Sequence, residues 1–286
     1  EKQNLMTYLD VDTENNYYYS EVKGRELYFV NEGLKVPKYG QAELVEAETS
    51  FTAYQEFQSM LTRDRIDIFM VGEFDDYQVL QALHRFPLEG RQVDLQFSYS
   101  QPYVNVVKEK IEPRQSSQSI LQLGYQFPYQ YGDKDYFALI VFNAMFGEFA
   151  HSALFTTLRE KEGLAYSISS QFDIFTGLLE VYAGIEKSNR DQAMRGISRE
   201  LNYIKLGRFS SSLLNQTKKI IRMNALLSED HALTLVEQRF NKVIFGDKSL
   251  SLENWLDEIE KVTKKDVCRV ARQVKLQSLF FLEGVS

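Results

Sequence analysis

Two predicted strands in the second half of this sequence are separated by only two residues. Residues 164–175 and 178–185 have the patterns of strands, and Thr176-Gly177 lies between them. A short link that contains glycine between two such runs is typical of an antiparallel hairpin. We therefore expect the fold to be organised around an antiparallel sheet.

Further strand and helix patterns surround the hairpin. Strands are expected at residues 120–127 and 278–282. Helical spacing of apolar residues predicts helices over residues 133–146, 152–160, 191–206, 211–227, 231–245, 252–260 and 264–273. Runs of strands that alternate with runs of helices indicate an α+β fold, in which a mostly antiparallel sheet packs against helices.

The first third is mostly helical in pattern. Helices are expected at residues 1–9 and 17–30, at 51–61 behind the N-cap Thr49-Ser50, and from Asp75-Asp76 to His84. The first of these has no capping residue before it, so we expect an upstream segment to be missing. Residues 66–72 form a short apolar run bounded by charges and glycine, and this run predicts a buried strand.

The character of the sequence changes between residues 87 and 117, which are polar and include three prolines. Local alternation at Val93, Leu95 and Phe97 predicts an edge strand, and the following residues are typical of a linker. We therefore expect a linker at residues 101–116, which joins residues 1–100 to a C-terminal domain of residues 117–286.

Composition excludes several functional classes. The formal net charge is −7 and the sequence has no basic stripe, so neither nucleic acid nor an anionic membrane surface is an expected partner. No apolar run approaches the roughly 18–20 residues that a membrane span needs. The single cysteine, Cys268, excludes an intrachain disulfide, and without an export signal in view the expected location is the cytoplasm.

Motifs for independent catalysis are absent. The three histidines, His84, His151 and His231, are too widely spaced to share a helix face, and none belongs to a zinc-peptidase motif. The sequence also has no phosphate-binding glycine loop and no Gly-x-Ser-x-Gly elbow. We therefore expect that this chain binds no metal and no cofactor by itself.

One long motif resembles a known family. Residues 142–147 read FNAMFG, residues 152–155 read SALF and residues 158–167 read LREKEGLAYS. This run, with TGL at 176–178 and YAG at 182–184, resembles the second domain of insulinase/pitrilysin-type zinc peptidases. VGEF at 71–74 resembles the end of the preceding domain. The resemblance implies that residues 1–100 are the C-terminal part of a first peptidase-like domain and residues 117–286 a complete second one.

The same resemblance implies a role for two residues. In this family an arginine and a tyrosine seven residues apart bind the substrate peptide and stabilise the oxyanion, and Arg159 and Tyr166 match that pair. A guanidinium and a phenol offer hydrogen-bond donors where negative charge develops on the attacked carbonyl. If a strand begins at Leu164, then Leu164 and Tyr166 share one face of it, and Arg159 ends the preceding helix near the same cleft wall.

Zinc is implied on a missing domain or on a partner, because the family's first domain holds it. A distal zinc glutamate is not expected from this chain, since Asp10 and Asp12 are the only carboxylates between residues 3 and 13. The family's glycine- and serine-rich turn is also replaced here by the bulkier residues 147–152.

Three functions remain open. The first is a non-catalytic subunit that works on a peptide substrate, either in a heterodimer with a homologous zinc-bearing subunit or in a homo-oligomer. The second is the C-terminal portion of a self-sufficient zinc endopeptidase whose N-terminal zinc domain is absent from this sequence. The third is a scaffold member of the family without a peptidase role.

Overall fold

The computed structural model describes residues 1–85, 91, 93, 95 and 99–285, apart from the side chains of residues 12 and 13. Its strands are β1 (Lys108–Gln115), β2 (Ser119–Gln126), β3 (Ala165–Asp173), β4 (Leu178–Ile185) and β5 (Lys275–Val285). They form one sheet in the order β1-β5-β2-β4-β3. Only the β1–β5 pair is parallel, and the other three pairs are antiparallel. The predicted α+β fold with a mostly antiparallel sheet is confirmed.

The predicted linker contains a strand. β1 occupies residues that the sequence assigns to the linker, and it pairs in parallel with β5, so that Lys108 lies opposite Ser278. Its polar and charged side chains fit an edge position, where one side of the strand faces solvent. Local pattern missed this strand because its partner lies at the far end of the chain. The edge strand expected near residues 93–97 lies largely outside the described residues.

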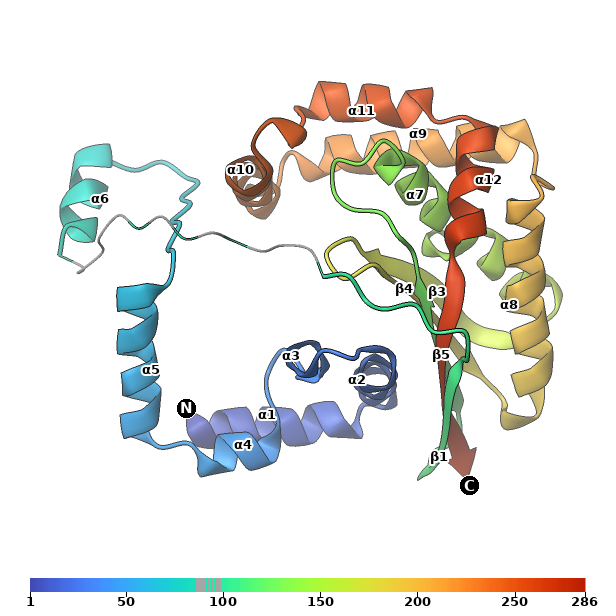
Figure 1. Ribbon diagram of the computed structural model, residues 1–286, viewed down its shortest axis with the longest axis horizontal. Coiled ribbons are helices and arrows are strands. Elements are labelled where there is room, and N and C mark those ends of the chain that lie inside the picture. Colours follow the sequence, from blue (N-terminus) through green and yellow to red (C-terminus); the bar gives the residue numbers. More distant parts are fainter. Residues whose placement is uncertain (86–90, 92, 94, 96–98, 286) are drawn as a thin grey trace.

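Helices cover one face of the sheet and bury the main core (Figure 1). Alternate residues of the central strands, including Leu121, Leu123, Leu179 and Val181, point into this core and are essentially inaccessible to solvent. The helical elements of this part of the chain are α7 (Tyr136–Asn143), η1 (Ala144–Glu148), η2 (Phe155–Lys161), η3 (Lys187–Asn189), α8 (Arg190–Lys205), α9 (Ser211–Ser228), α10 (Ala232–Phe245), η4 (Gly246–Lys248), α11 (Leu252–Lys261) and α12 (Lys264–Gln273).

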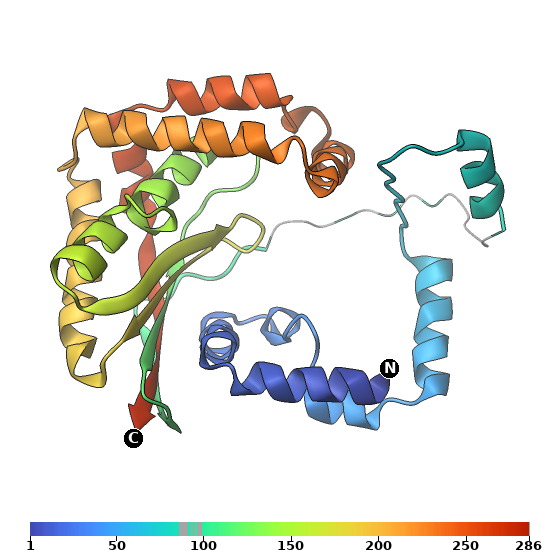
Figure 2. The same ribbon diagram turned by 180° about the vertical axis from the view of Figure 1, so that it is seen from behind.

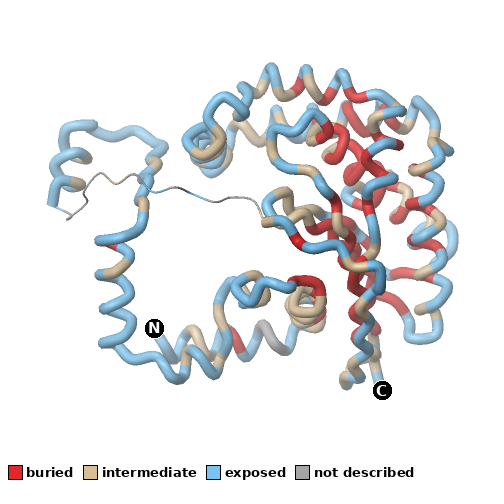
Figure 3. Tube along the Cα trace, viewed as in Figure 1, coloured by how far each residue is buried: buried red, intermediate tan, exposed pale blue. Residues whose placement is uncertain are grey.

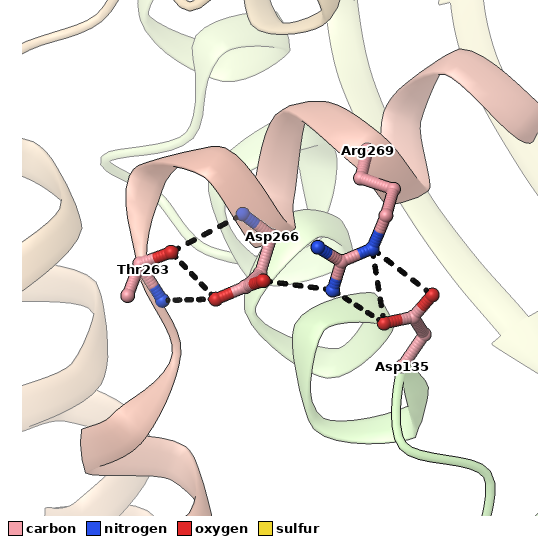
Figure 4. Close-up of polar contacts among 4 residues, drawn as sticks. All are labelled: Asp135, Thr263, Asp266 and Arg269. Carbon is pink, nitrogen blue, oxygen red and sulfur yellow. Dashed lines mark hydrogen bonds and ion pairs between the residues drawn. The ribbon is translucent and has the colours of Figure 1, made fainter.

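A polar network ties α12 to the start of α7 (Figure 4). Thr263 and Asp266 form a reciprocal capping box at the N-terminus of α12. The guanidinium of Arg269 binds Asp266 at 2.7 Å and Asp135, which precedes α7, at 2.5 Å. Burial alone would raise the pKa of Asp266, but the hydrogen bonds from Thr263 and Arg269 outweigh it and lower that pKa.

A helix from the first third covers the opposite face of the sheet (Figures 1 and 2). The first third forms α1 (Lys2–Glu14), α2 (Asn16–Tyr28), α3 (Glu32–Lys35), α4 (Ala42–Ala47), α5 (Ser50–Arg63) and α6 (Asp76–Leu83). α2 approaches β2 so closely that a Cβ atom on Gly24 would lie 2.7 Å from Cγ of Gln122. Arg25 then reaches the buried Glu180 of β4 through two hydrogen bonds of 3.0 and 2.8 Å. A helix of the predicted first domain therefore packs on the sheet of the predicted second, and the division into two domains stays a prediction.

Residues 50–85, which we call the arm, extend away from the sheet and its covering helices in residues 99–285, which we call the body (Figure 1). The arm contains α5 and α6, and almost all of its side chains are exposed (Figure 3). The predicted buried strand at residues 66–72 is wrong: these residues form no strand, and Ile68 is 50% exposed. A strand needs a neighbour with which to exchange backbone hydrogen bonds, and none of the described residues pairs with this segment. It touches α10 instead, where the rings of Phe69 and Phe240 meet.

Candidate functional site

The two residues of the predicted pair lie on either side of the link between η2 and β3. The expected helix at residues 152–160 is π-helical over Phe155–Lys161, a rare geometry that is often found at functional sites. It ends when the backbone N–H of Glu162 donates to the carbonyl of Thr157 at 2.9 Å and that of Leu164 donates to Leu158 at 2.8 Å. Gly163 takes a φ of 62°. Glycine adopts this left-handed conformation without steric cost, and the chain turns there into the strand.

Arg159 lies on the outside of this π-helix. Its guanidinium is exposed and sits 4.6 Å from the centre of the Phe155 ring, four residues earlier in the chain. This cation–π contact orients the side chain along the helix surface while its N–H groups stay at the surface. The neighbouring Leu158 is buried against Gly196 of α8 and anchors the π-helix to the body.

Tyr166 occupies a bulge at the start of β3. Ala165 pairs with Ile185 and Ser167 with Gly184, so that Tyr166 is the extra residue between two consecutive pairs. Bulges redirect side chains. Here Tyr166 is 57% exposed whereas Leu164 is buried. The expectation that Leu164 and Tyr166 share one face is therefore wrong, because β3 begins one residue later than predicted and is immediately bulged.

The hydroxyl of Tyr166 has a partner that the sequence analysis missed. It donates to Oε1 of Glu186 at 2.7 Å. This hydrogen bond, followed by desolvation and the charge of Glu186, raises the pKa of Tyr166. Glu186 directly follows Ile185, which pairs with Ala165. A correct register for the predicted hairpin would thus have pointed to Glu186.

Arg159 in η2 and Tyr166 in β3 are both exposed and flank the turn at residues 162–164, but no hydrogen bond joins these two described residues. In the part of the chain that the structure describes, the contact of Arg159 is the Phe155 ring and that of the Tyr166 hydroxyl is Glu186. Chemically, the turn offers guanidinium N–H donors at one end and a phenol bonded to a carboxylate at the other.

The family model for the peptidase M16 inactive domain matches residues 54–221, which include this turn. The chain belongs to the M16 peptidase family. These are the insulinase/pitrilysin-type peptidases that the sequence motif resembles, so the predicted family is confirmed.

This M16 chain has relatives by sequence and among solved structures. The probable inactive metalloprotease YmfF of Bacillus subtilis is 32% identical over 285 residues, which are 99% of this chain and 67% of YmfF. A conserved protein from Enterococcus faecalis V583 has a TM-score of 0.94 at 36% identity, over 99% of this chain and 67% of that one. The uncharacterized zinc protease YmxG of B. subtilis is 24% identical, over 85% of this chain and 59% of YmxG. The chain thus spans about two thirds of the length of these M16 relatives or less.

The described residues of this M16 chain do not fit a zinc site. Among the described residues, no three or more histidine, cysteine, aspartate or glutamate side chains are grouped so that they could hold a metal ion. His84 follows α6, His231 precedes α10, and the ring of His151 contacts Thr217 of α9 at 2.8 Å. That zinc is held outside this chain stays a prediction.

The bulky turn at residues 147–152 is tied to the sheet by hydrogen bonds that involve the buried side chains of Asn143 and Ser170. Ser170 donates to Oδ1 of Asn143 at 2.7 Å, and Nδ2 of Asn143 donates to Glu148 at 2.9 Å. Asn143 and Glu148 are five residues apart, and the π-helix η1 brings residues at that spacing together. Gly147 lies so close to β3 that an added Cβ would meet the backbone nitrogen of Ser170 at 2.8 Å. This M16 turn therefore packs against the sheet through specific contacts of its own.

Within the described part of this M16 chain, no helix combines the length and the apolar character needed to cross a membrane.

Proposed function

We propose that this chain is a non-catalytic M16 component that contributes Arg159 and Tyr166 to an active site whose zinc is held elsewhere. One observation carries the proposal: the bulge of β3 pushes the Tyr166 phenol outward beside the π-helical turn that exposes Arg159. Both residues lie inside the segment that the family model matches. A related protein, YmfF, is named as a probable inactive metalloprotease, which supports a non-catalytic role.

The two side chains suit complementary tasks on a peptide. The guanidinium of Arg159 presents several N–H donors in a fixed plane and can hold a peptide carbonyl or carboxylate. The phenol of Tyr166 can donate a hydrogen bond where charge develops on the carbonyl under attack. Neither task requires a metal ligand from this chain, in keeping with the poor fit of its described residues to a zinc site.

The zinc-bearing component is proposed to be a homologous peptidase subunit in a heterodimer, or another copy in a homo-oligomer, and the substrate to be a peptide in the cytoplasm. A second possibility is that the chain is the C-terminal portion of a self-sufficient zinc endopeptidase. The partial coverage of YmxG, a relative named as a zinc protease, favours this possibility. A scaffold role is favoured by the fact that Arg159 and Tyr166 each have a partner within the chain itself.

The decisive experiment uses this chain together with its zinc-bearing component, purified as one complex, with the isolated chain as the baseline that shows no turnover. Tyr166→Phe removes only the hydroxyl and is expected to lower kcat by roughly 10²–10³, the scale for one oxyanion donor. Arg159→Ala is expected to raise KM as well, because it weakens peptide binding.

Matched controls are Tyr203→Phe and Arg195→Ala, which alter exposed residues of the same types on α8. Both should leave turnover unchanged. Full turnover by the complex after both Tyr166→Phe and Arg159→Ala would contradict the proposal and favour the scaffold role.

A further inference from the structure

Glu186 is held close to Tyr166 by the sheet register. β4 ends at Ile185, whose partner in β3 is Ala165, so Glu186 follows directly beyond the last pair of the hairpin. The bulge adds Tyr166 at the same place on the neighbouring strand, and its hydroxyl reaches Oε1 of Glu186 at 2.7 Å. Backbone pairing thus brings the two residues together at the end of the hairpin.

Glu186 is exposed, and the two cations that follow it in the chain are bound to other acids. Nζ of Lys187, the next residue, pairs with Glu283 at 3.2 Å. Arg190 pairs with Glu109 of β1 and lies over the ring of Phe281. Within the described part of the chain, the polar side-chain contact of the Glu186 carboxylate is therefore the phenol of Tyr166.

This pairing affects what Tyr166 can do. A phenol has a single proton to donate, and Glu186 already accepts it. A carboxylate beside the phenol would also repel negative charge that develops on a peptide carbonyl. With Glu186 ionised and in place, the hydroxyl is consequently a weaker donor to an oxyanion.

We propose that Glu186 gates Tyr166: it holds the phenolic proton until a positively charged group of the peptide substrate binds the Glu186 carboxylate. The cation then neutralises the carboxylate and frees the proton for the oxyanion. Glu186 acts in this way as a positioning residue that makes the shared site selective for cationic peptides. The inference rests on the proposed function, since it assumes that Tyr166 serves a peptide.

The first test uses this chain alone and reads the contact directly. Tyrosine labelled with ¹³C at Cζ reports the pKa of Tyr166 by NMR titration, with Tyr166→Phe used to assign the signal. Glu186→Gln should lower that pKa toward the ordinary value for tyrosine, whereas Glu160→Gln, a change of an exposed glutamate in η2, should not. A pKa that does not respond to Glu186→Gln overturns the gating proposal and leaves the proposed function intact.

The second test uses the complete complex and two peptides that differ only by lysine and glutamine at one position. Glu186→Gln should raise kcat for the uncharged peptide by about two- to fivefold, the scale of one exposed charge–charge interaction, here the repulsion between the Glu186 carboxylate and the developing oxyanion. The same substitution should remove the preference for the cationic peptide. In a Tyr166→Phe background Glu186→Gln should no longer change kcat.

The outcomes separate the two proposals. If Tyr166→Phe lowers turnover but Glu186→Gln lowers it too, Glu186 merely supports the ring, and only the gating proposal fails. If Tyr166→Phe has no effect on turnover of the lysine peptide, the proposed function fails and the gating proposal fails with it, even when the NMR titration confirms the contact.

Discussion

The body and the arm of this molecule both contain helices with aromatic side chains, but those helices bury very different amounts of apolar surface. α7 in the body buries five of its eight residues, among them Phe142. α5 in the arm has 14 residues with phenylalanine, tyrosine and methionine on its surface, yet Leu61 is the residue it buries. α7 is apolar on nearly all sides and is covered by the sheet, whereas α5 has both polar and apolar residues and no opposing surface among the described residues.

α2 sharpens this comparison because it belongs to the first third of the sequence and packs like the body. Tyr28 is fully buried against Gly124, where an added Cβ would lie 2.9 Å from the ring, and Arg25 binds the buried Glu180. The boundary between well-packed and exposed structure therefore lies after α2 in the chain. It is set by access to the second face of the sheet.

The largest expected contrast is between two phenylalanine truncations. Phe142 is 0% exposed and stacks on Phe146. Phe142→Ala empties this site and should lower the free energy of unfolding by about 3–5 kcal/mol. Phe57 on α5 is 47% exposed. Phe57→Ala should therefore change the free energy of unfolding by at most about 0.5 kcal/mol, the scale of a surface substitution.

Urea unfolding followed by circular dichroism measures both truncations. An equal loss for Phe57→Ala would mean that the arm is covered in solution.

A smaller effect is expected where α2 meets the sheet. Arg25→Ala leaves the buried Glu180 carboxylate without its ion-pair partner, with only the hydrogen bond from Gln171 remaining, and should cost about 1–3 kcal/mol, reduced because Arg25 is itself partly exposed. Arg63→Ala, at the exposed end of α5, is the matched control. Hydrogen exchange should then show faster exchange in α2 for Arg25→Ala only. Unchanged protection of α2 would place this helix outside the cooperative unit of the body.

The smallest effect comes from two capping boxes, one in each region. Asp266 belongs to the box of α12, and Thr52 belongs to the Thr49–Thr52 box of α5. Asp266→Asn should lower the free energy of unfolding by about 1 kcal/mol at neutral pH, whereas Thr52→Ala should not affect global unfolding.

The effect of Asp266→Asn should also depend on pH. The folded pKa of Asp266 is lowered from its ordinary value of 3.8. Its stabilising contribution is therefore present above that ordinary value and is lost as the pH falls through the folded pKa. Wild type and Asp266→Asn should converge in acid, as thermal unfolding from neutral to acidic pH would reveal. A constant difference over this range would rule out ionisation of Asp266 as its origin.

Features that depend on neighbouring residues could be predicted from the sequence. The N-cap Thr49, the N-cap Asp75 and the turn at Thr176-Gly177 are found where the sequence places them. The helices of the C-terminal part and the α+β class follow from periodicity in the same way. The family, and with it the choice of Arg159 and Tyr166, came from one contiguous motif. All these patterns extend over short, contiguous stretches of sequence, so they can be recognised without knowing how distant segments pack.

Features that depend on a distant partner were decided only by the tertiary structure. β1 exists because β5 lies beside it, and residues 66–72 form no strand because none of the described residues pairs with them. The docking of α2, the bulge at Tyr166 and the contact with Glu186 likewise depend on strand register and on packing between separate segments. A strand gains its hydrogen bonds from another segment, and one residue of slippage turns every side chain to the other face. Sequence periodicity specifies neither the partner nor the register, which is why the local elements were predicted well and the surroundings of Tyr166 were not.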